Sequence, residues 1–170
     1  MVLRWSLFAL AAIVVIVMVV TLVGLLLPQG HHASRTVTFK AQPSDVYGAI
    51  TNFATYGDWR RDVKRAEMIA DDGHGLRFRE LGDHGGLTFR IEVREPYTRV
   101  VTRIDDPKAA FGGSWTYELK PNGTGTDLTI TEDGEVYNPI FRFMSRFFFS
   151  NTTTMENYQA DLKRHMGERD

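Results

Sequence analysis

The hydrophobic and polar residues of this chain follow three successive patterns, and each pattern predicts a different kind of element. Residues 7–27 form an apolar run without a charged side chain. From residue 63 to residue 136, apolar and polar residues alternate with a period of two, which is typical of short β-strands. Beyond Asn138-Pro139, apolar residues recur at helical spacing as far as Gly167. The pattern therefore predicts an apolar N-terminal helix, a sheet and a long C-terminal helix.

The apolar run is long enough to cross a bilayer. At about 1.5 Å per residue it spans about 30 Å, the thickness of the hydrocarbon core. A secretory signal peptide would have a shorter apolar region of roughly 7–15 residues, followed by a cleavage site between small residues. The sequence shows neither feature. We therefore expect residues 1–28 to be an uncleaved single-pass membrane anchor, residues 29–34 to be a linker and residues 35–170 to form one domain.

The charged residues that flank the apolar run leave the side of the membrane open. Arg4 precedes the run, and Arg35 and Lys40 follow it. A short basic N-terminal tail tends to stay in the cytoplasm, which favours an extracytoplasmic domain. Residues 28–34 reach only about 23 Å even when fully extended, so we expect the domain to lie close to the lipid headgroups.

After the linker, the order of the predicted elements is that of an α+β domain. Turns rich in Gly, Pro, Asp and Asn separate the strands, and connections this short join antiparallel neighbours. Only the C-terminal helix is long enough to cover the hydrophobic face of such a sheet. We therefore expect a curved antiparallel sheet wrapped around this helix, with a cavity between the two layers. The predicted elements are a strand at 35–40, helical segments at 41–50 and 53–59, strands at 63–70, 76–81, 87–94, 99–105, 112–120 and 127–136, and a helix from 138 to 167.

Three segments of the domain resemble the START-like, polyketide cyclase-like (SRPBCC) superfamily in their order and spacing. They are residues 37–59, 114–136 and 138–149. The resemblance covers the whole domain, is strongest to bacterial members with an N-terminal membrane helix, and implies a helix-grip fold with a hydrophobic cavity. Lipid carriers, hormone binders and cyclases all occur in this superfamily, so the fold leaves the function open.

Strand phase predicts which side chains line the expected cavity. The lining is mainly apolar and aromatic, but two carboxylates share the phase of apolar neighbours. From the strands and the second helical segment, the predicted lining residues are Trp59, Phe78, Glu80, Phe89, Ile91, Trp115, Tyr117, Ile130 and Glu132. From the C-terminal helix they are Met144, Phe147, Phe148, Asn151 and Met155, which fall on one stripe.

Glu132 is the candidate catalytic residue. Burial in an apolar pocket raises the pKa of a carboxyl group, which can then act as an acid or a base near neutral pH. Tyr117 or Asn151 would be its partner. The alternative is that water or an arginine satisfies Glu80 and Glu132 near the strand ends, and that the aromatic residues simply pack in the core.

The opposite face of the C-terminal helix carries Arg142, Arg146 and Phe149. Arginines and aromatic rings together suit the headgroup region of a bilayer. We therefore predict that this face contacts the membrane. The alternative is that other parts of the domain cover Phe149.

Composition narrows the range of functions. With 20 Lys and Arg, 21 Asp and Glu and no cysteine, the chain offers no basic surface for nucleic acid, no thiolate nucleophile and no zinc–thiolate site. The histidine pairs, His31 with His32 and His74 with His84, lack the spacing of metal ligands, so we interpret them as surface residues. We find no phosphate-binding loop or nucleophile motif, and expect no metal and no cofactor.

Together these observations predict a membrane-anchored, non-catalytic protein that binds a lipid or another hydrophobic small molecule. One alternative is a cyclase- or dehydratase-like enzyme that acts on a hydrophobic substrate in the same cavity. Another is an accessory protein that binds a partner through its surface. The sequence does not indicate an oligomeric state.

Overall fold

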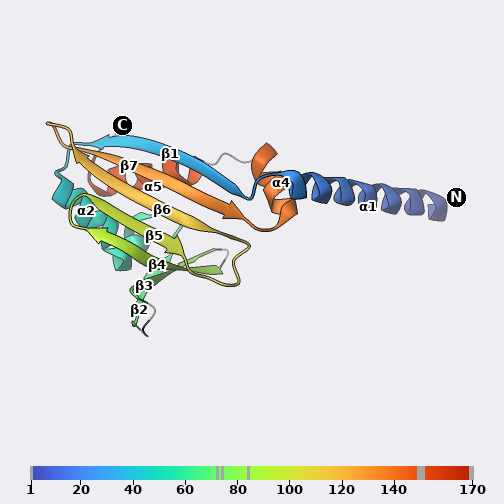
Figure 1. Cartoon of the computed structure of the whole chain (residues 1–170), viewed down its shortest axis with the longest axis horizontal. Coiled ribbons are helices and arrows are strands. Elements are labelled where there is room, and N and C mark those ends of the chain that lie inside the picture. Colours follow the sequence, from blue (N-terminus) through green and yellow to red (C-terminus); the bar gives the residue numbers. More distant parts are fainter. Residues whose placement is uncertain (1, 72, 74, 84, 149–151, 169–170) are drawn as a thin grey trace.

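A computed structural model describes residues 2–71, 73, 75–83, 85–148 and 152–168 of the chain. Figure 1 shows a curved sheet with helices on one face and a single long helix projecting from one end. In chain order the elements are α1 (Val2–Leu26), β1 (Gly30–Phe39), α2 (Pro43–Thr51), the 3-10 helix η1 (Phe53–Thr55), α3 (Tyr56–Trp59), β2 (Arg65–Ile69), β3 (Arg77–Gly82), β4 (Gly85–Glu95), β5 (Arg99–Ile104), β6 (Phe111–Pro121), β7 (Thr126–Val136), α4 (Pro139–Phe148) and α5 (Thr153–His165).

The seven strands form one antiparallel sheet in the order β1-β7-β6-β5-β4-β3-β2. Each connection from β2 to β7 is short, so consecutive strands lie side by side, and β1 closes the far edge against β7. This confirms the predicted α+β fold of a curved antiparallel sheet with a C-terminal helix. At one end of the sheet β1, β4 and β6 begin and β3, β5 and β7 end; we call it the α1 end, because α1 precedes β1 there.

The core lies between the sheet and α5. Met155, Tyr158 and Leu162 follow one another at helical spacing along α5 and are buried against the sheet. From β7, Leu128 and Ile130 project toward them with the period of two that a strand requires. Burial of each such apolar side chain contributes about 1.5–3 kcal/mol to the free energy of unfolding. The helix α5 is thus held to the concave face mainly by apolar contact.

The predicted linker at residues 29–34 is wrong, because β1 already begins at Gly30. Its pairing with β7 runs from Gly30 opposite Glu135 to Phe39 opposite Thr126. Polar side chains join the two strands on the outer face, where the hydroxyl groups of Ser34 and Thr131 lie 3.0 Å apart. Such cross-strand pairs stabilise a sheet without any apolar side chain. The domain therefore starts closer to α1 than predicted.

The predicted single C-terminal helix is two helices, α4 and α5. Only α5 lies against the sheet, whereas α4 packs beside the end of α1 (Figure 1). Two of the predicted lining residues on α4, Phe147 and Phe148, are 58% and 66% exposed. Residues Phe149 and Asn151, predicted to face the membrane and the cavity, lie outside the described residues. The helical period was read correctly, but one half of the stripe does not face the sheet.

Arg142 joins α4 to α1 and is buried, which contradicts its predicted membrane contact. Its guanidinium group donates hydrogen bonds to the carbonyl oxygens of Gly24 (3.1 Å) and Leu27 (3.2 Å), and to those of Val136 (3.0 Å) and Tyr137 (3.1 Å). Carbonyl groups in the last turn of a helix have no partner within the helix, and a cation is favourable there. A side chain on Gly24 would overlap the backbone of Pro139, so the two helices approach closely at this point.

We expect Arg142→Gln to lower the free energy of unfolding by about 1.5–3 kcal/mol, because buried carbonyl groups lose a charged donor. Thermal unfolding of the detergent-solubilised full chain measures the change. Arg146→Gln, an exposed arginine on the same helix, is the matched control and should change the stability by less than about 0.5 kcal/mol. Equal effects of the two substitutions would contradict a structural role for Arg142.

Candidate functional site

The concave face of the sheet carries the side chains that sequence phase assigned to the cavity. Register pairs Phe78 with Phe89, Trp115 with Glu132 and Tyr117 with Ile130. Directly opposed residues of an antiparallel pair project to the same face. The predicted strand residues therefore share one face of the sheet, including both carboxylates, although three strands separate Glu80 from Glu132.

Much of the space between the sheet and α5 is filled by aromatic rings. Tyr158 of α5 lies at the centre, with ring centroids 5.3 Å from Trp59, 5.7 Å from Trp115 and 5.7 Å from Tyr117. Burial raises the pKa of Tyr117 and Tyr158 well above the usual tyrosine value, so both hydroxyl groups stay protonated. Five predicted lining residues are buried in this packed region: Trp59, Phe78, Tyr117, Ile130 and Met155. They form the closed end of the interior.

A buried ion pair borders the aromatic cluster. Arg60, which follows α3, donates a hydrogen bond to Glu80 of β3 (2.6 Å) and another to Asp62 (2.7 Å). Its guanidinium carbon lies 5.0 Å from the ring centroid of Tyr56 and 5.2 Å from that of Tyr158, within the range of cation–π contacts. An arginine thus satisfies Glu80, as one of the two sequence alternatives expected.

Burial and the mutual attraction of Arg60 and Glu80 determine the pKa values of both groups. Burial raises the pKa of Glu80, while the Arg60 charge opposes that rise and Asp62 adds to it. Burial would lower the pKa of Arg60, but Glu80 and Asp62 raise it, and the net direction is upward. Arg60 therefore stays cationic beneath the aromatic rings.

Open space remains at the α1 end of the sheet. A groove of about 510 Å³ lies where the end of β3, the start of β4 and the loop before β6 come together. Its lining combines the apolar side chains of Val63, Leu87, Ala109 and Phe111 with the charged side chains of Asp62, Arg79, Glu80, Asp83, Asp106 and Lys108. Three other predicted lining residues, Phe89, Ile91 and Trp115, are only partly buried on the same concave face. This groove therefore lies at the end of the sheet from which α1 projects.

Glu132 lies on the concave face as predicted, but its partner is one that sequence reasoning missed. The ring nitrogen Nε2 of His31 lies 3.2 Å from Oε1 of Glu132. The prediction that His31 is a surface residue in a linker is wrong, because His31 is part of β1. The signal was available, because His31 and Ala33 continue backward the alternation that Val37 and Phe39 begin. His74 and His84 lie outside the described residues.

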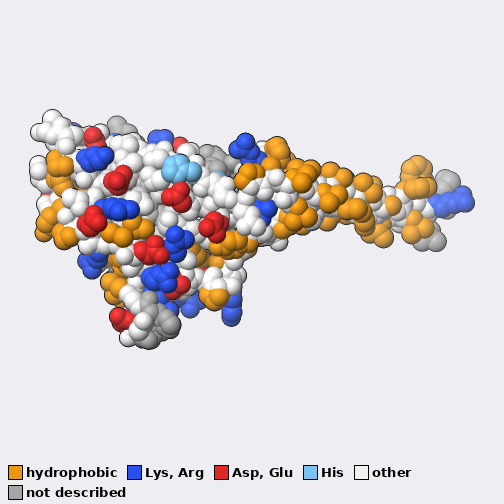
Figure 2. Space-filling model, viewed as in Figure 1, with side chains coloured by type: hydrophobic (Ala, Val, Ile, Leu, Met, Phe, Trp, Pro, Cys, Tyr) orange, Lys and Arg blue, Asp and Glu red, His pale blue; other side chains and the backbone are white. Residues whose placement is uncertain are grey.

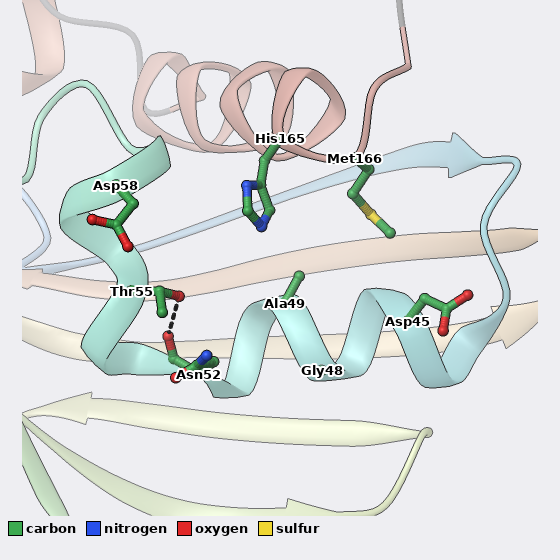
Figure 3. Close-up of a pocket in the computed structure, with 8 residues that line it drawn as sticks. All are labelled: Asp45, Gly48, Ala49, Asn52, Thr55, Asp58, His165 and Met166. Atoms are coloured by element: carbon green, nitrogen blue, oxygen red, sulfur yellow. Dashed lines mark hydrogen bonds between the residues drawn. The ribbon is translucent and has the colours of Figure 1, made fainter.

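A second groove, of about 520 Å³, lies between α2 and the end of α5 (Figure 3). Its lining includes Asp45, Asn52, Asp58 and His165. Figure 3 shows the two aspartates at opposite ends of this groove, and His165 stacks on Trp59 with ring centroids 5.5 Å apart. Within the described part of the chain, no group of three His, Asp or Glu side chains could hold a metal ion. This groove lies beside α2, toward the end of the sheet opposite α1, and its lining mixes polar and apolar side chains, as does that of the groove at the α1 end.

An antiparallel sheet curved around a C-terminal helix defines the helix-grip class of proteins. A family model described as polyketide cyclase / dehydrase and lipid transport matches residues 30–165. The chain belongs to this family, which confirms the SRPBCC resemblance read from the sequence. No curated protein matches the chain in sequence.

Solved structures show the same fold at low sequence identity. A START superfamily protein from Mycobacterium smegmatis is 18% identical, with a TM-score of 0.64 over 81% of this chain and 97% of that one. The Zhui aromatase/cyclase from Streptomyces sp. R1128 is 16% identical, with a TM-score of 0.64 over 81% and 92%. Norcoclaurine synthase from Thalictrum flavum is 10% identical, with a TM-score of 0.63 over 82% and 88%. At these identities the likeness establishes the fold and no more.

Proposed function

We propose that the protein is a membrane-anchored binder of a lipid or another hydrophobic small molecule. The observation that carries this proposal is the position of the groove at the α1 end of the sheet. A ligand could pass from the bilayer surface into this groove, whose lining includes the apolar side chains of Val63, Leu87 and Phe111. The family description, which includes lipid transport, supports the same class of ligand.

The anchor in this proposal is α1. Residues Arg4–Leu26 form the one described helix that is long and apolar enough to cross a membrane. Figure 2 shows hydrophobic side chains along the projecting helix. Apolar surface of this extent is stable only when another apolar phase covers it. The basic N-terminal tail supports an extracytoplasmic position for the domain.

The exposed phenylalanines of α4 extend the proposed membrane contact to the domain itself. Phe141, Phe147 and Phe148 are exposed beside the end of α1, and Arg146 shares their helix. We expect a fluorescent label on Phe148→Cys to be quenched by bromolipids in nanodiscs at least about twofold more than a label on Lys120→Cys, which lies at the far end of the sheet. The natural chain has no cysteine, so each label is unique. Equal quenching at the two positions would reject contact between α4 and the bilayer.

The ligand itself is tested by native mass spectrometry of the full chain, followed by lipid extraction. We expect a reproducible bound molecule in the natural protein. Ala109→Trp places a large ring in the groove and should reduce ligand occupancy about tenfold or more. Ala54→Trp, at an exposed position of η1, is the matched control and should retain the ligand. Retention of the ligand by Ala109→Trp would exclude this groove as its site.

A cyclase- or dehydratase-like enzyme is the second candidate, and the His31–Glu132 pair is the observation that favours it. Two titratable groups within hydrogen-bond distance on the concave face meet a requirement of acid–base catalysis. The family description includes cyclases and dehydrases. Glu132→Gln separates the candidates, because an enzyme would lose turnover of its substrate, whereas a pure binder has no turnover to lose.

A further inference from the structure

His31 and Glu132 form a polar pair on the ligand-facing side of the sheet. Along β1, His31 has the phase of Ala33, Val37 and Phe39, which pack in or against the core. Glu132 has the phase of Ile130 on β7, and is directly opposite Trp115 of β6. Both side chains therefore belong to the face that binds the ligand in the proposed function.

A glycine on the neighbouring strand, Gly134, leaves space for the His31 ring. A Cβ atom on Gly134 would overlap the His31 ring, so the imidazole lies over a glycine of the neighbouring strand. The side chains of His31 and Glu132 remain 23% and 21% exposed. Within the described residues, no other hydrogen bond reaches either side chain. The pair is thus held in position by β7 and yet accessible.

The first two turns of α5 contact β1 at Arg35. Glu156 in the first turn of α5 accepts a hydrogen bond from Arg35 (3.2 Å), and Gln159 donates one to the Arg35 carbonyl oxygen (3.0 Å). His31 lies four residues closer to α1, about 13 Å further along the strand. It follows the last residue of α1, Leu26, by five residues, a span of at most about 17 Å. A head group at His31 could therefore belong to a molecule whose chain reaches the bilayer.

The chemistry of the pair selects the kind of head group. When neutral His31 donates its Nε2–H to Glu132, its Nδ1 and the second carboxylate oxygen are both left as hydrogen-bond acceptors. These acceptors suit a head group that donates hydrogen bonds. The negative charge of Glu132 repels an anionic head group. The adjacent Trp115 ring offers a further favourable surface to a cation.

We propose that His31 and Glu132 bind the hydrogen-bond-donating head of an amphiphile, an alcohol or an amine, and discriminate against carboxylate heads. This inference rests on the proposed binding function and deepens it. The neighbouring pair of His32 and Asp133, 2.7 Å apart on the outer face, is more exposed and provides an internal control.

The test uses the detergent-solubilised full chain and three probes with the same chain, dodecanol, dodecylamine and dodecanoic acid, measured by native mass spectrometry. The natural protein should bind the alcohol and the amine about tenfold more tightly than the acid, since a hydrogen bond to a charged group changes affinity by about that factor. His31→Gln and Glu132→Gln should each lose this preference. His32→Gln and Asp133→Asn should keep it.

Gly134→Ala tests the geometry while leaving both side chains in place. The added methyl group should displace the His31 ring and remove the preference, whereas Gly30→Ala, with no close neighbour for a Cβ, should not. Equal binding of the three probes by the natural protein, or an unchanged preference in His31→Gln and Glu132→Gln, would overturn the head-group site and leave the binding function standing. Binding of none of the probes would overturn the binding function as well.

Discussion

Arg60→Met is expected to lower the free energy of unfolding by about 3–5 kcal/mol, the usual cost of removing one partner from a buried ion pair. The substitution leaves Glu80 in the interior without the guanidinium group that lies 2.6 Å away. It also removes a cation from beneath the rings of Tyr56 and Tyr158. A domain of this size is stable by only about 5–15 kcal/mol, so the change should be large in urea unfolding of the detergent-solubilised chain.

Two further variants show whether the buried pair is the cause. Arg35→Met removes an arginine from a pair with Glu156 in which both side chains are nearly half exposed, and should cost less than about 1 kcal/mol. Arg60→Met combined with Glu80→Leu removes both buried charges, and should recover much of the lost stability because the remaining carboxylate, Asp62, is 56% exposed. If the double variant is no more stable than Arg60→Met alone, the buried charge of Glu80 is not responsible.

The deficit of Arg60→Met should also depend on pH. Burial raises the pKa of Glu80 above its ordinary value of 4.5, and removal of Arg60 takes away a charge that opposes this rise. A carboxyl group with a raised pKa in the folded protein favours folding when it is protonated. That contribution is fully present below about pH 4.5 and is lost as the pH rises through the folded pKa. The variant should therefore approach the natural protein in stability near pH 4 and fall furthest behind at pH 7.

The strands could be predicted because each carries its own signal. Alternation and turn residues located β2 to β7 within a few residues, since apolar side chains of these strands face a packed layer. The start of β1 carries a weaker signal, because Ala33 is the one apolar residue between Gly30 and Arg35 and only His31 continues its phase. The length of β7, rather than any apolar residue of β1, determines that this pairing continues to Gly30.

The helical pattern predicted a stripe but not the surface that covers it. Phe147 and Phe148 share the period of Met155, yet α4 packs beside α1. A wheel diagram does not include a competing partner such as the carbonyl groups at the end of α1, which bind Arg142. Long-range partners were missing from the site for the same reason. The phase of Glu132 was readable, but its pairing with His31, one hundred and one residues earlier in the chain, follows only from the sheet order.

Tyr158→Ala is expected to cost about 3–5 kcal/mol, because Tyr158 fills the centre of the aromatic cluster and is almost completely buried. Tyr158→Phe is the matched control. It removes only the hydroxyl group that lies 3.2 Å from the Tyr56 hydroxyl, and should cost about 1 kcal/mol. Thermal unfolding of both variants measures the difference between losing a ring and losing one hydrogen bond.

The same substitution tests whether the interior is closed at this point. Truncation of Tyr158 should leave a cavity between Trp59, Trp115 and Tyr117, of a shape that phenol fits. At ten times its Kd, phenol should then stabilise Tyr158→Ala by about 1.4 kcal/mol and leave the natural protein unchanged. Stabilisation of the natural protein by phenol would mean that the cluster already contains open space. If the natural protein is not stabilised, the ring of Tyr158 closes the interior at this point. A ligand of the proposed kind is then confined to the α1 end, where the groove and the His31–Glu132 pair lie.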